Sequence, residues 1–209
     1  MDRFGIIIQA RLGSTRYPNK ISELLGAKSM LEFCVTRALE IPNSIVVVCS
    51  PEDEKDHPFW KLFELCSVVY GSHNNLLQRY LKAAESFSLD IVVRLTADNP
   101  FFSKRTIKEA VDYLQINGLD YVSAKRDDGA WLPYGVGCEV FTLNALKTVS
   151  ESKDLSHQEH VSEAFLDHLG MRCGILFKPL DLCSQETKEL SLTVDYPEQL
   201  ALIQEIELF

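Results

Sequence analysis

Three basic side chains fall within ten residues of one short segment near the start of the chain. Arg11, Arg16 and Lys20 are interspersed with small and turn-forming residues in the segment ARLGSTRYPNK. Guanidinium groups bind phosphate oxygens in a bidentate way, and successive backbone N–H groups in a turn can hold an anion. Gly13 would let the backbone approach that anion closely. The segment therefore predicts a triphosphate-binding loop, with a solvated basic loop as the alternative, and it matches neither the P-loop nor the G-x-G-x-x-G pattern.

Two aspartates follow apolar, strand-like runs elsewhere in the chain. Asp98 follows the run at 91–95, and Asp195 follows the run at 190–194. Proteins bind Mg²⁺ through one or two carboxylates, together with substrate phosphates and waters. Asp98 and Asp195 are therefore predicted to hold a divalent metal beside the basic loop. The alternatives are that Asp98 shapes the turn before Pro100 and that Asp195 caps a helix; a capping aspartate still has one oxygen free for a metal.

Short β-branched runs alternate with longer segments of helical periodicity along the chain. The expected strands are 4–9, 44–49, 67–70, 90–95, 120–124, 137–142, 172–178 and 190–194. The expected helices are 30–41, 59–65, 76–87, 106–116, 143–149, 157–169 and 197–208. This alternation predicts an α/β fold with a mostly parallel sheet covered on both faces. Ligands of such sheets bind beyond the carboxyl ends of the strands, which is where the basic loop and both aspartates fall.

Length and composition are those of an ordinary globular protein. The 209 residues fit one domain, 1–209, in which the alternation loosens over 118–175, the expected lid, acceptor or dimerisation portion. A net charge of −9 disfavours broad nucleic-acid binding, although a local basic site for a small anion is compatible with it. There is no membrane-length apolar run and no signal-peptide cleavage pattern. The six scattered cysteines fit reduced core thiols, so we expect a cytoplasmic protein.

The spacing of the basic loop resembles a known family signature. Ala10-Arg11-x-Gly13-Ser14-x-Arg16-x-Pro18-x-Lys20, after an amino-terminal strand, is similar to the motif of the cytidylyltransferases that make CMP-activated sugar acids. The similarity is to the spore-coat polysaccharide biosynthesis branch, related to the acylneuraminate and 3-deoxy-manno-octulosonate cytidylyltransferases. It implies a three-layer, Rossmann-like nucleotide-diphospho-sugar transferase fold with a mixed sheet. It also implies nucleotide binding by Ala10, Arg11, Leu12, Gly13, Ser14, Arg16 and Lys20, and catalysis by Arg11, Lys20, Asp98 and Asp195.

Three further segments extend the resemblance into the middle of the chain. The segment GSHNNLLQRY makes Arg79 a candidate nucleotide contact, against the alternative of a helix-surface arginine. Tyr70 stands where relatives often carry an arginine associated with the base, so it is a departure that leaves the base preference open; its ring could instead stack on a base. Glu139, in the segment GCEVF, is implied to bind the acceptor, with an edge-strand position as the alternative. His160, in HQEHV, is implied to bind the acceptor or act as a base, whereas the neighbouring Glu159 also fits a capping box with Ser156.

The resemblance and the residues together predict a Mg²⁺-dependent enzyme. It would transfer CMP from CTP to a sugar or sugar acid, releasing pyrophosphate, for surface polysaccharide or glycan biosynthesis. Two alternatives stay open: transfer to a sugar or alcohol phosphate, giving a diphosphate link, and a catalytically inactive nucleotide-binding module. Relatives are often homodimers, so self-association is implied by analogy.

Overall fold

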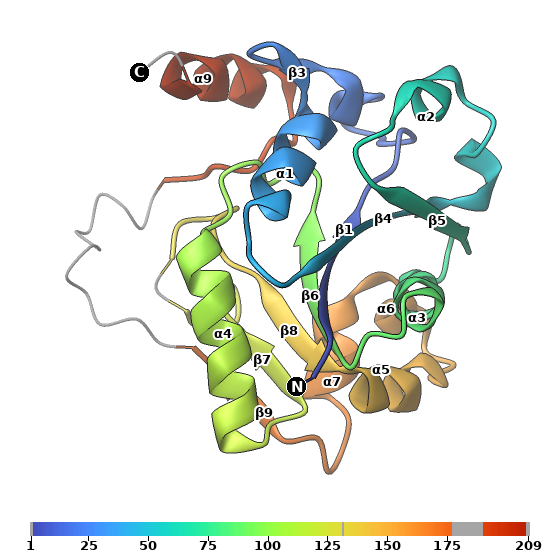
Figure 1. The fold of residues 1–209 in the computed structure, drawn as a ribbon, viewed down its shortest axis with the longest axis vertical. Coiled ribbons are helices and arrows are strands. Elements are labelled where there is room, and N and C mark those ends of the chain that lie inside the picture. Colours follow the sequence, from blue (N-terminus) through green and yellow to red (C-terminus); the bar gives the residue numbers. More distant parts are fainter. Residues whose placement is uncertain (1, 131, 177–189, 208–209) are drawn as a thin grey trace.

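Seven strands of the computed structural model form one twisted sheet through the centre of the molecule (Figure 1). The structure describes residues 2–130, 132–176 and 190–207. Across the sheet the strand order is β5 (Ser67–Gly71), β4 (Ile45–Pro51), β1 (Phe4–Gln9), β6 (Ile91–Thr96), β8 (Glu139–Thr142), β7 (Tyr121–Ser123) and β9 (Cys173–Ile175). A two-stranded ribbon, β2 (Leu24–Leu25) with β3 (Lys28–Ser29), lies apart from it.

The sheet is mixed but mostly parallel. Strand β1 pairs in parallel with β4 and β6, β4 with β5, and β7 with β9. In the part of the chain that the structure describes, β8 alone runs against both of its neighbours. The central strands β1 and β4 have almost continuous apolar sequences because helices bury both of their faces. The predicted α/β class with a mixed, mostly parallel sheet is confirmed.

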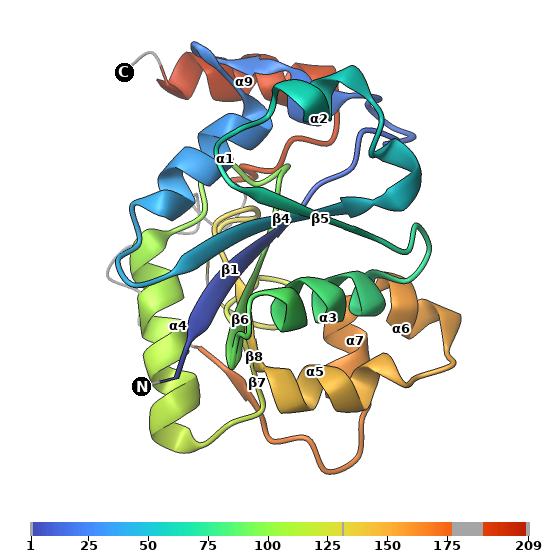
Figure 2. The same ribbon diagram turned by 45° about the vertical axis from the view of Figure 1, so that its right-hand side comes forward.

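Helices cover the sheet on both sides and give three layers (Figures 1 and 2). Helices α1 (Met30–Leu39), α4 (Lys104–Asn117) and α9 (Pro197–Glu207) lie on one side, and α3 (Leu76–Ser86), α5 (Leu143–Ser150) and α7 (Val161–Leu166) on the other. Short elements complete the fold: η1 (Lys20–Ser22), η2 (Glu52–Glu54), α2 (Pro58–Leu62) and α6 (Leu155–Glu159).

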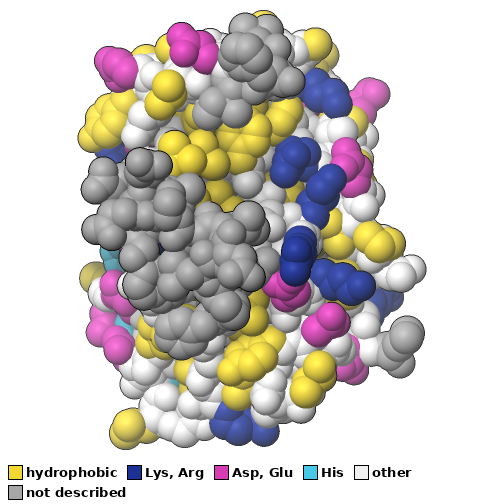
Figure 3. All heavy atoms as spheres, turned by 90° about the vertical axis from the view of Figure 1, so that its left-hand side faces the viewer, with side chains coloured by type: hydrophobic (Ala, Val, Ile, Leu, Met, Phe, Trp, Pro, Cys, Tyr) yellow, Lys and Arg dark blue, Asp and Glu magenta, His cyan; other side chains and the backbone are white. Residues whose placement is uncertain are grey.

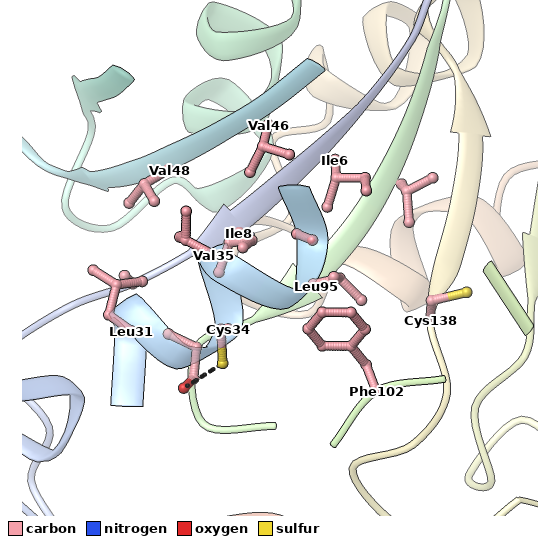
Figure 4. Packing of buried hydrophobic residues seen from close by; sticks show 14 of the residues in the cluster. Ile6, Ile8, Leu31, Cys34, Val35, Val46, Val48, Leu95, Phe102 and Cys138 are labelled. Carbon is pink, nitrogen blue, oxygen red and sulfur yellow. Dashed lines mark hydrogen bonds between the residues drawn. The ribbon is translucent and has the colours of Figure 1, made fainter. Parts of the chain in front are cut away.

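Successive side chains of a strand point to opposite faces of the sheet, so the strands contribute to two separate hydrophobic cores. Ile6 and Ile8 of β1 point to the α1 side, whereas Ile7 belongs to the core on the α3 side. Figure 4 shows the first of these cores, where strand residues meet Leu31 and Val35 of α1. The first core continues past the ends of β1 and β6 through Leu12 and Ala97, so the loops that follow these strands are held by buried apolar contacts at the carboxyl edge of the sheet.

Buried thiols are part of these cores. Cys34 is fully buried and donates to the carbonyl of Ala97 across 3.5 Å (Figure 4), and burial raises the pKa of this thiol well above its ordinary value. Burial raises the pKa of Cys49 to about 12. Cys34, Cys49, Cys66 and Cys173 are free thiols, as expected, although Cys173 is exposed; Cys183 lies outside the described residues.

The structure divides one predicted helix into two. The helix expected over 157–169 is two short helices, α6 and α7, separated by His160 in a non-helical conformation. Asp154, not Ser156, caps α6, because the Asp154 side chain accepts the N–H of Ser156 while the Ser156 hydroxyl donates to Glu163. The predicted capping box with Glu159 is therefore wrong.

The strand expected over 190–194 is not formed. Within the described ranges this segment has one isolated bridge, between Ser191 and Tyr134. The N–H of Val194 then donates to the carbonyl of Asp98, so the segment crosses the end of the sheet and brings the start of α9 to the turn after β6. The strand expected over 172–178 is shorter, and its last two residues lie outside the described ranges.

The surface is mixed in charge. On the face shown in Figure 3, Lys and Arg side chains gather in a local band, although the whole chain has a net charge of −9. Local positive sites therefore coexist with an acidic chain. Among the described residues, no helix is long and apolar enough to cross a membrane.

Candidate active site

A lysine ammonium sits between the two aspartates that follow apolar runs. Lys20 Nζ donates to Asp98 Oδ2 at 2.7 Å, to Asp195 Oδ1 at 3.1 Å and to the carbonyl of Val194 at 2.8 Å. We call Lys20, Asp98 and Asp195 the Lys20 cluster. Arg16 Nη2 adds a second cation, 2.8 Å from Asp195 Oδ1. The loop after β1, the turn after β6 and the segment before α9 meet at this point, as the strand ends predict.

The Lys20 cluster is partly open to solvent. The Lys20 side chain is 8% exposed, but those of Asp98 and Asp195 are 27% and 22% exposed. Three oxygen atoms converge on one cation, and oxygen atoms are the ligands that a hard divalent metal requires. The donor set therefore fits Mg²⁺, provided that the Lys20 ammonium gives up its central position. In the described ranges there is no cluster of three or more His, Cys, Asp or Glu side chains of the kind that holds a metal, so protein carboxylates alone would not complete such a site.

A cavity of about 780 Å³ opens next to the Lys20 cluster. It gathers predicted residues from distant parts of the chain: Ala10, Arg11, Ser14, Arg16, Lys20, Arg79, Asp98 and His160. The basic loop forms one wall, the amino-terminal end of α3 another, and α6 a third; α6 lies beside α3 (Figure 2). Asp195 does not line the cavity but contacts two cations that do. Most of the nucleotide-binding residues singled out from the sequence therefore share this space.

Two residues of the basic loop face away from the cavity. The Leu12 side chain is buried in the core, and neither Leu12 nor Gly13 lines the cavity. Their N–H groups donate to the carboxylate of Glu54, at distances of 2.9 to 3.0 Å. The expected anion-binding turn is thus present, but its anion is a side chain of the protein. These two N–H groups are not available to a phosphate while Glu54 holds them.

Arg79 is buried at the amino-terminal end of α3. It is 5% exposed, so the alternative of a helix-surface arginine is wrong. Its Nη2 donates to the carbonyl of His73 at 3.4 Å, and its Nε has no hydrogen-bond partner among the described residues. A buried guanidinium with an unsatisfied donor beside a cavity is suited to an anionic ligand.

A second charged cluster lies beneath the cavity, in the middle of the sheet. Glu139 of β8 pairs with Arg94 of β6 and accepts a hydrogen bond from the Tyr121 hydroxyl at 3.0 Å. We call these three residues the Glu139 cluster. Arg94 also donates to Gln9 at 2.9 Å, and Lys125 Nζ lies 3.5 Å from the carboxylate of Glu139.

The Glu139 cluster is almost closed to solvent. The side chains of Glu139 and Arg94 are 1% and 12% exposed. Burial by itself would raise the pKa of Glu139, but Arg94, Lys125 and Tyr121 together hold it below its ordinary value. Strand β8 lies between β6 and β7, so the edge-strand alternative for Glu139 is wrong. Binding of acceptor hydroxyls by Glu139 stays a prediction, because its oxygen atoms already have protein partners.

A smaller hollow of about 110 Å³ adjoins the cavity at Arg94 and Thr96. Lys125 and Arg126 supply positive charge to it, and Arg126 Nη1 is buried without a hydrogen-bond partner among the described residues. A side chain at Gly137 would come within 2.1 Å of the carbonyl of Ala124, so only glycine allows the two loops to approach here.

Tyr70 lies outside the cavity lining, whereas His160 is part of it. The Tyr70 ring packs edge-on against Trp60, with Lys55 Nζ 6.0 Å from the ring centre, and Tyr70 is not part of the cavity lining. His160 lines the cavity at the break between α6 and α7. Base stacking by Tyr70 therefore has no support in this geometry, and the acceptor role of His160 stays a prediction.

Several functional candidates were missed by sequence reasoning. Gln9, His73, Asn74 and Thr96 line the cavity, and Glu54 holds the basic loop. Gln9 and Thr96 are the last residues of β1 and β6, and Glu54 closely follows β4. Gln9, Thr96 and Glu54 could therefore have been predicted from their positions at or just after strand ends. Lys125 and Arg126 have no comparable signal in the sequence.

The fold and site together define a nucleotide-binding α/β enzyme. A mostly parallel sheet presents several cations and Asp98 around a cavity at its carboxyl edge, where ligands of such sheets bind, and Asp195 contacts two of those cations. The chain belongs to the cytidylyltransferase family: residues 5–208 match the family model described as "Cytidylyltransferase". It is therefore an enzyme of the cytidylyltransferase class.

Two curated relatives are similar over most of the chain. An uncharacterized protein, MJ1063, from Methanocaldococcus jannaschii is 31% identical over 208 residues, covering 96% of this chain and 82% of the relative. The spore coat polysaccharide biosynthesis protein SpsF of Bacillus subtilis is 29% identical over 174 residues, covering 78% of this chain and 69% of SpsF.

Solved structures agree with the fold. A cytidylyltransferase from Leptospira borgpetersenii superposes with a TM-score of 0.86 at 29% identity, covering 100% of this chain and 88% of that one. The CMP:2-keto-3-deoxy-manno-octonic acid synthetase complexed with CTP gives a TM-score of 0.71 at 16% identity, covering 99% and 98%. The second likeness shows the fold, and the predicted nucleotidyltransferase architecture is confirmed.

Proposed function

We propose that this enzyme transfers CMP from CTP to a sugar or sugar acid, with release of pyrophosphate, in surface polysaccharide or glycan biosynthesis. The family supports cytidylyl transfer, and the name of SpsF supports a polysaccharide setting. One observation carries the proposal: a single cavity holds the loop cations and Asp98 on one wall and His160 on another. Donor and acceptor can therefore meet there.

The cations of the cavity bind the triphosphate in this proposal. Arg11, Arg16 and Lys20 contact its phosphates from the basic loop, and Arg79 contributes from α3. Ala10 and Ser14 lie along the same wall. Guanidinium and ammonium groups fixed at this edge offset the charge of the phosphates and position the α-phosphorus for attack.

Asp98 and Asp195 are the residues proposed to hold Mg²⁺. Their facing oxygen atoms already bind one cation, the Lys20 ammonium. When bound, Mg²⁺ supplies neutralisation of the charge that develops on the leaving pyrophosphate. The Lys20 ammonium, displaced from between the two aspartates, then turns toward the phosphates.

The acceptor is proposed to enter beside Arg94, between His160 and the smaller hollow. Its hydroxyl oxygen forms a bond to the α-phosphorus while the bond from that phosphorus to the bridging oxygen breaks and pyrophosphate leaves. His160 binds the acceptor or takes the hydroxyl proton. Lys125 and Arg126 meet negative charge on the acceptor, and Glu139 holds Arg94 in place at the junction.

The test is pyrophosphate release with Mg²⁺ and each of the four nucleoside triphosphates, against sugars, sugar acids and their phosphates. We expect turnover with CTP and a sugar acid, and a loss of about a thousandfold in Asp98→Asn, because phosphoryl transfer depends on charge stabilisation. Lys104→Gln, at an exposed residue that does not line the cavity, is the control and should keep full activity.

The product decides between acceptor classes. Mass spectrometry showing a CMP monophosphate diester would support the proposal, whereas a diphosphate-linked product would replace it with transfer onto a sugar phosphate. Turnover that survives in Asp98→Asn would contradict the metal assignment. Association into a homodimer stays a prediction.

A further inference from the structure

The carboxylate of Glu54 occupies the turn of the basic loop where a phosphate was expected. Leu12 N–H donates to both carboxylate oxygens of Glu54, at 3.0 and 2.9 Å, and Gly13 N–H donates to Oε1 at 2.9 Å. Ser50, near the end of β4, donates to the other carboxylate oxygen at 3.3 Å. We infer that Glu54 is a positioning residue that anchors the basic loop from behind, so that Arg11 and the residues after Gly13 face the nucleotide cavity.

The placement of the loop residues supports an anchor and not a substrate contact. Leu12, Gly13 and Glu54 do not line the cavity, whereas Arg11 and Ser14 on either side of them do. The N–H groups of Leu12 and Gly13 therefore point to the far side of the loop. Hydrogen bonds to a charged acceptor are roughly twice as strong as neutral ones, so the two N–H donors, one of them shared between both carboxylate oxygens, hold this turn firmly.

The anchor is itself attached to the sheet. Glu54 is the last residue of η2, which directly follows β4, and β4 is hydrogen-bonded to β1 along its length. The loop leaves the end of β1, so Glu54 links it back to the neighbouring strand. A loop that is already fixed at Leu12 and Gly13 loses less freedom when a triphosphate binds, and this lowers the entropic cost of binding.

The same short turn contacts the other wall of the cavity. Asp53 Oδ1 lies 3.0 Å from His73 Nδ1, and His73 lines the cavity just before α3. This hydrogen bond holds the pKa of Asp53 below its ordinary value. Two consecutive carboxylates of η2 thus hold the two loops that flank the cavity, although Glu54 alone contacts the basic loop.

Glu54→Gln is the sharpest substitution, because it keeps the size of the side chain and removes the charge. One amide oxygen can still accept an N–H, but the amide nitrogen would meet another donor. The matched control is Glu52→Gln in the same turn, where the native side chain is exposed and lies 3.6 Å from Lys55. Glu54→Asp, which keeps the charge on a shorter side chain, is the second variant if Glu54→Gln does not fold.

The first measurement is amide hydrogen exchange at Leu12 and Gly13 in the nucleotide-free protein, detected by NMR. We expect exchange at these two positions to become at least about tenfold faster in Glu54→Gln and to stay unchanged in Glu52→Gln, because local opening governs exchange. Unchanged exchange in Glu54→Gln would overturn the inference. This measurement does not depend on any substrate.

The second measurement is the dissociation constant for CTP and the kinetics of transfer, and it rests on the proposed function. We expect the dissociation constant and the KM for CTP to rise about tenfold in Glu54→Gln, with the acceptor KM unchanged, because a misplaced loop loses positioning. Tighter binding of CTP by Glu54→Gln would instead identify Glu54 as a competitor of the phosphates. Failure of the wild-type protein to bind CTP would refute the proposed function and leave the exchange result to decide on Glu54.

Discussion

The Lys20 cluster and the Glu139 cluster each hold a basic side chain between oxygen atoms, and the two clusters differ in their exposure to solvent. In the Lys20 cluster the two aspartate side chains are about a quarter exposed, so a ligand can reach their oxygen atoms, although the Lys20 side chain itself is only 8% exposed. In the Glu139 cluster the carboxylate is 1% exposed, and each of its oxygen atoms has a protein partner. Exposure therefore separates a site that can accept a new ligand from one that fixes the sheet.

The expected contributions to folding stability separate the two clusters in the same way. A partly exposed ion pair contributes little to stability because water competes for both charges. A buried pair whose partner is removed leaves an uncompensated charge in a medium of low dielectric. The Lys20 cluster should accordingly matter for turnover more than for folding, and the Glu139 cluster for folding first.

The largest expected effect is that of Glu139→Ala on stability. Removal of this carboxylate leaves Arg94 buried without its partner, so the free energy of unfolding should fall by about 3–5 kcal/mol. Asp98→Ala leaves Lys20 with Asp195 and the Val194 carbonyl, and should cost no more than about 1 kcal/mol. Urea unfolding followed by circular dichroism measures both variants. Equal losses would refute the division between the two clusters.

A smaller effect is the pH dependence that Glu139 contributes. Burial would raise its pKa, but Arg94 and its other partners hold it below the ordinary value of 4.5. A carboxylate with a lowered pKa in the folded state stabilises the protein fully above its unfolded pKa. That stabilisation is lost as the pH falls below about 4.5 and through the folded pKa.

The measurement compares wild type with Glu139→Gln, so that other carboxylates cancel. The difference in free energy of unfolding should be constant from about pH 6 to pH 8 and should shrink below about pH 4.5. A difference that grows on acidification would mean that the pKa of Glu139 is raised and that burial outweighs Arg94.

The two clusters also differ in how well the sequence predicted them. Lys20, Asp98 and Asp195 each follow a strand or a strand-like run, so the rule for parallel sheets brought them to one edge. Glu139 was also singled out, but its partner Arg94 was not among the predicted site residues, because pairing across β6 and β8 depends on an antiparallel register that the local sequence does not encode. The role of Glu54 likewise arises from tertiary contacts, in which its carboxylate accepts the N–H groups of Leu12 and Gly13.

The smallest expected effect on stability is that of Arg16→Gln, at the rim of the Lys20 cluster. The Arg16 side chain is 55% exposed, and its ion pair with Asp195 is 2.8 Å long. Water and salt screen such a pair, so the free energy of unfolding should change by less than about 1 kcal/mol.

The same substitution should affect nucleotide binding far more than folding. Arg16 lines the cavity, so loss of its guanidinium should raise the KM for CTP about tenfold, with a smaller change in kcat, because it removes a phosphate contact made before and during transfer. Arg105→Gln, an exposed arginine paired with Glu109 on α4, is the matched control and should leave both quantities unchanged. The contrary result would be a loss of several kcal/mol in stability with an unaltered KM for CTP. Arg16 would then be structural, and solvent exposure would no longer distinguish the Lys20 cluster from the Glu139 cluster.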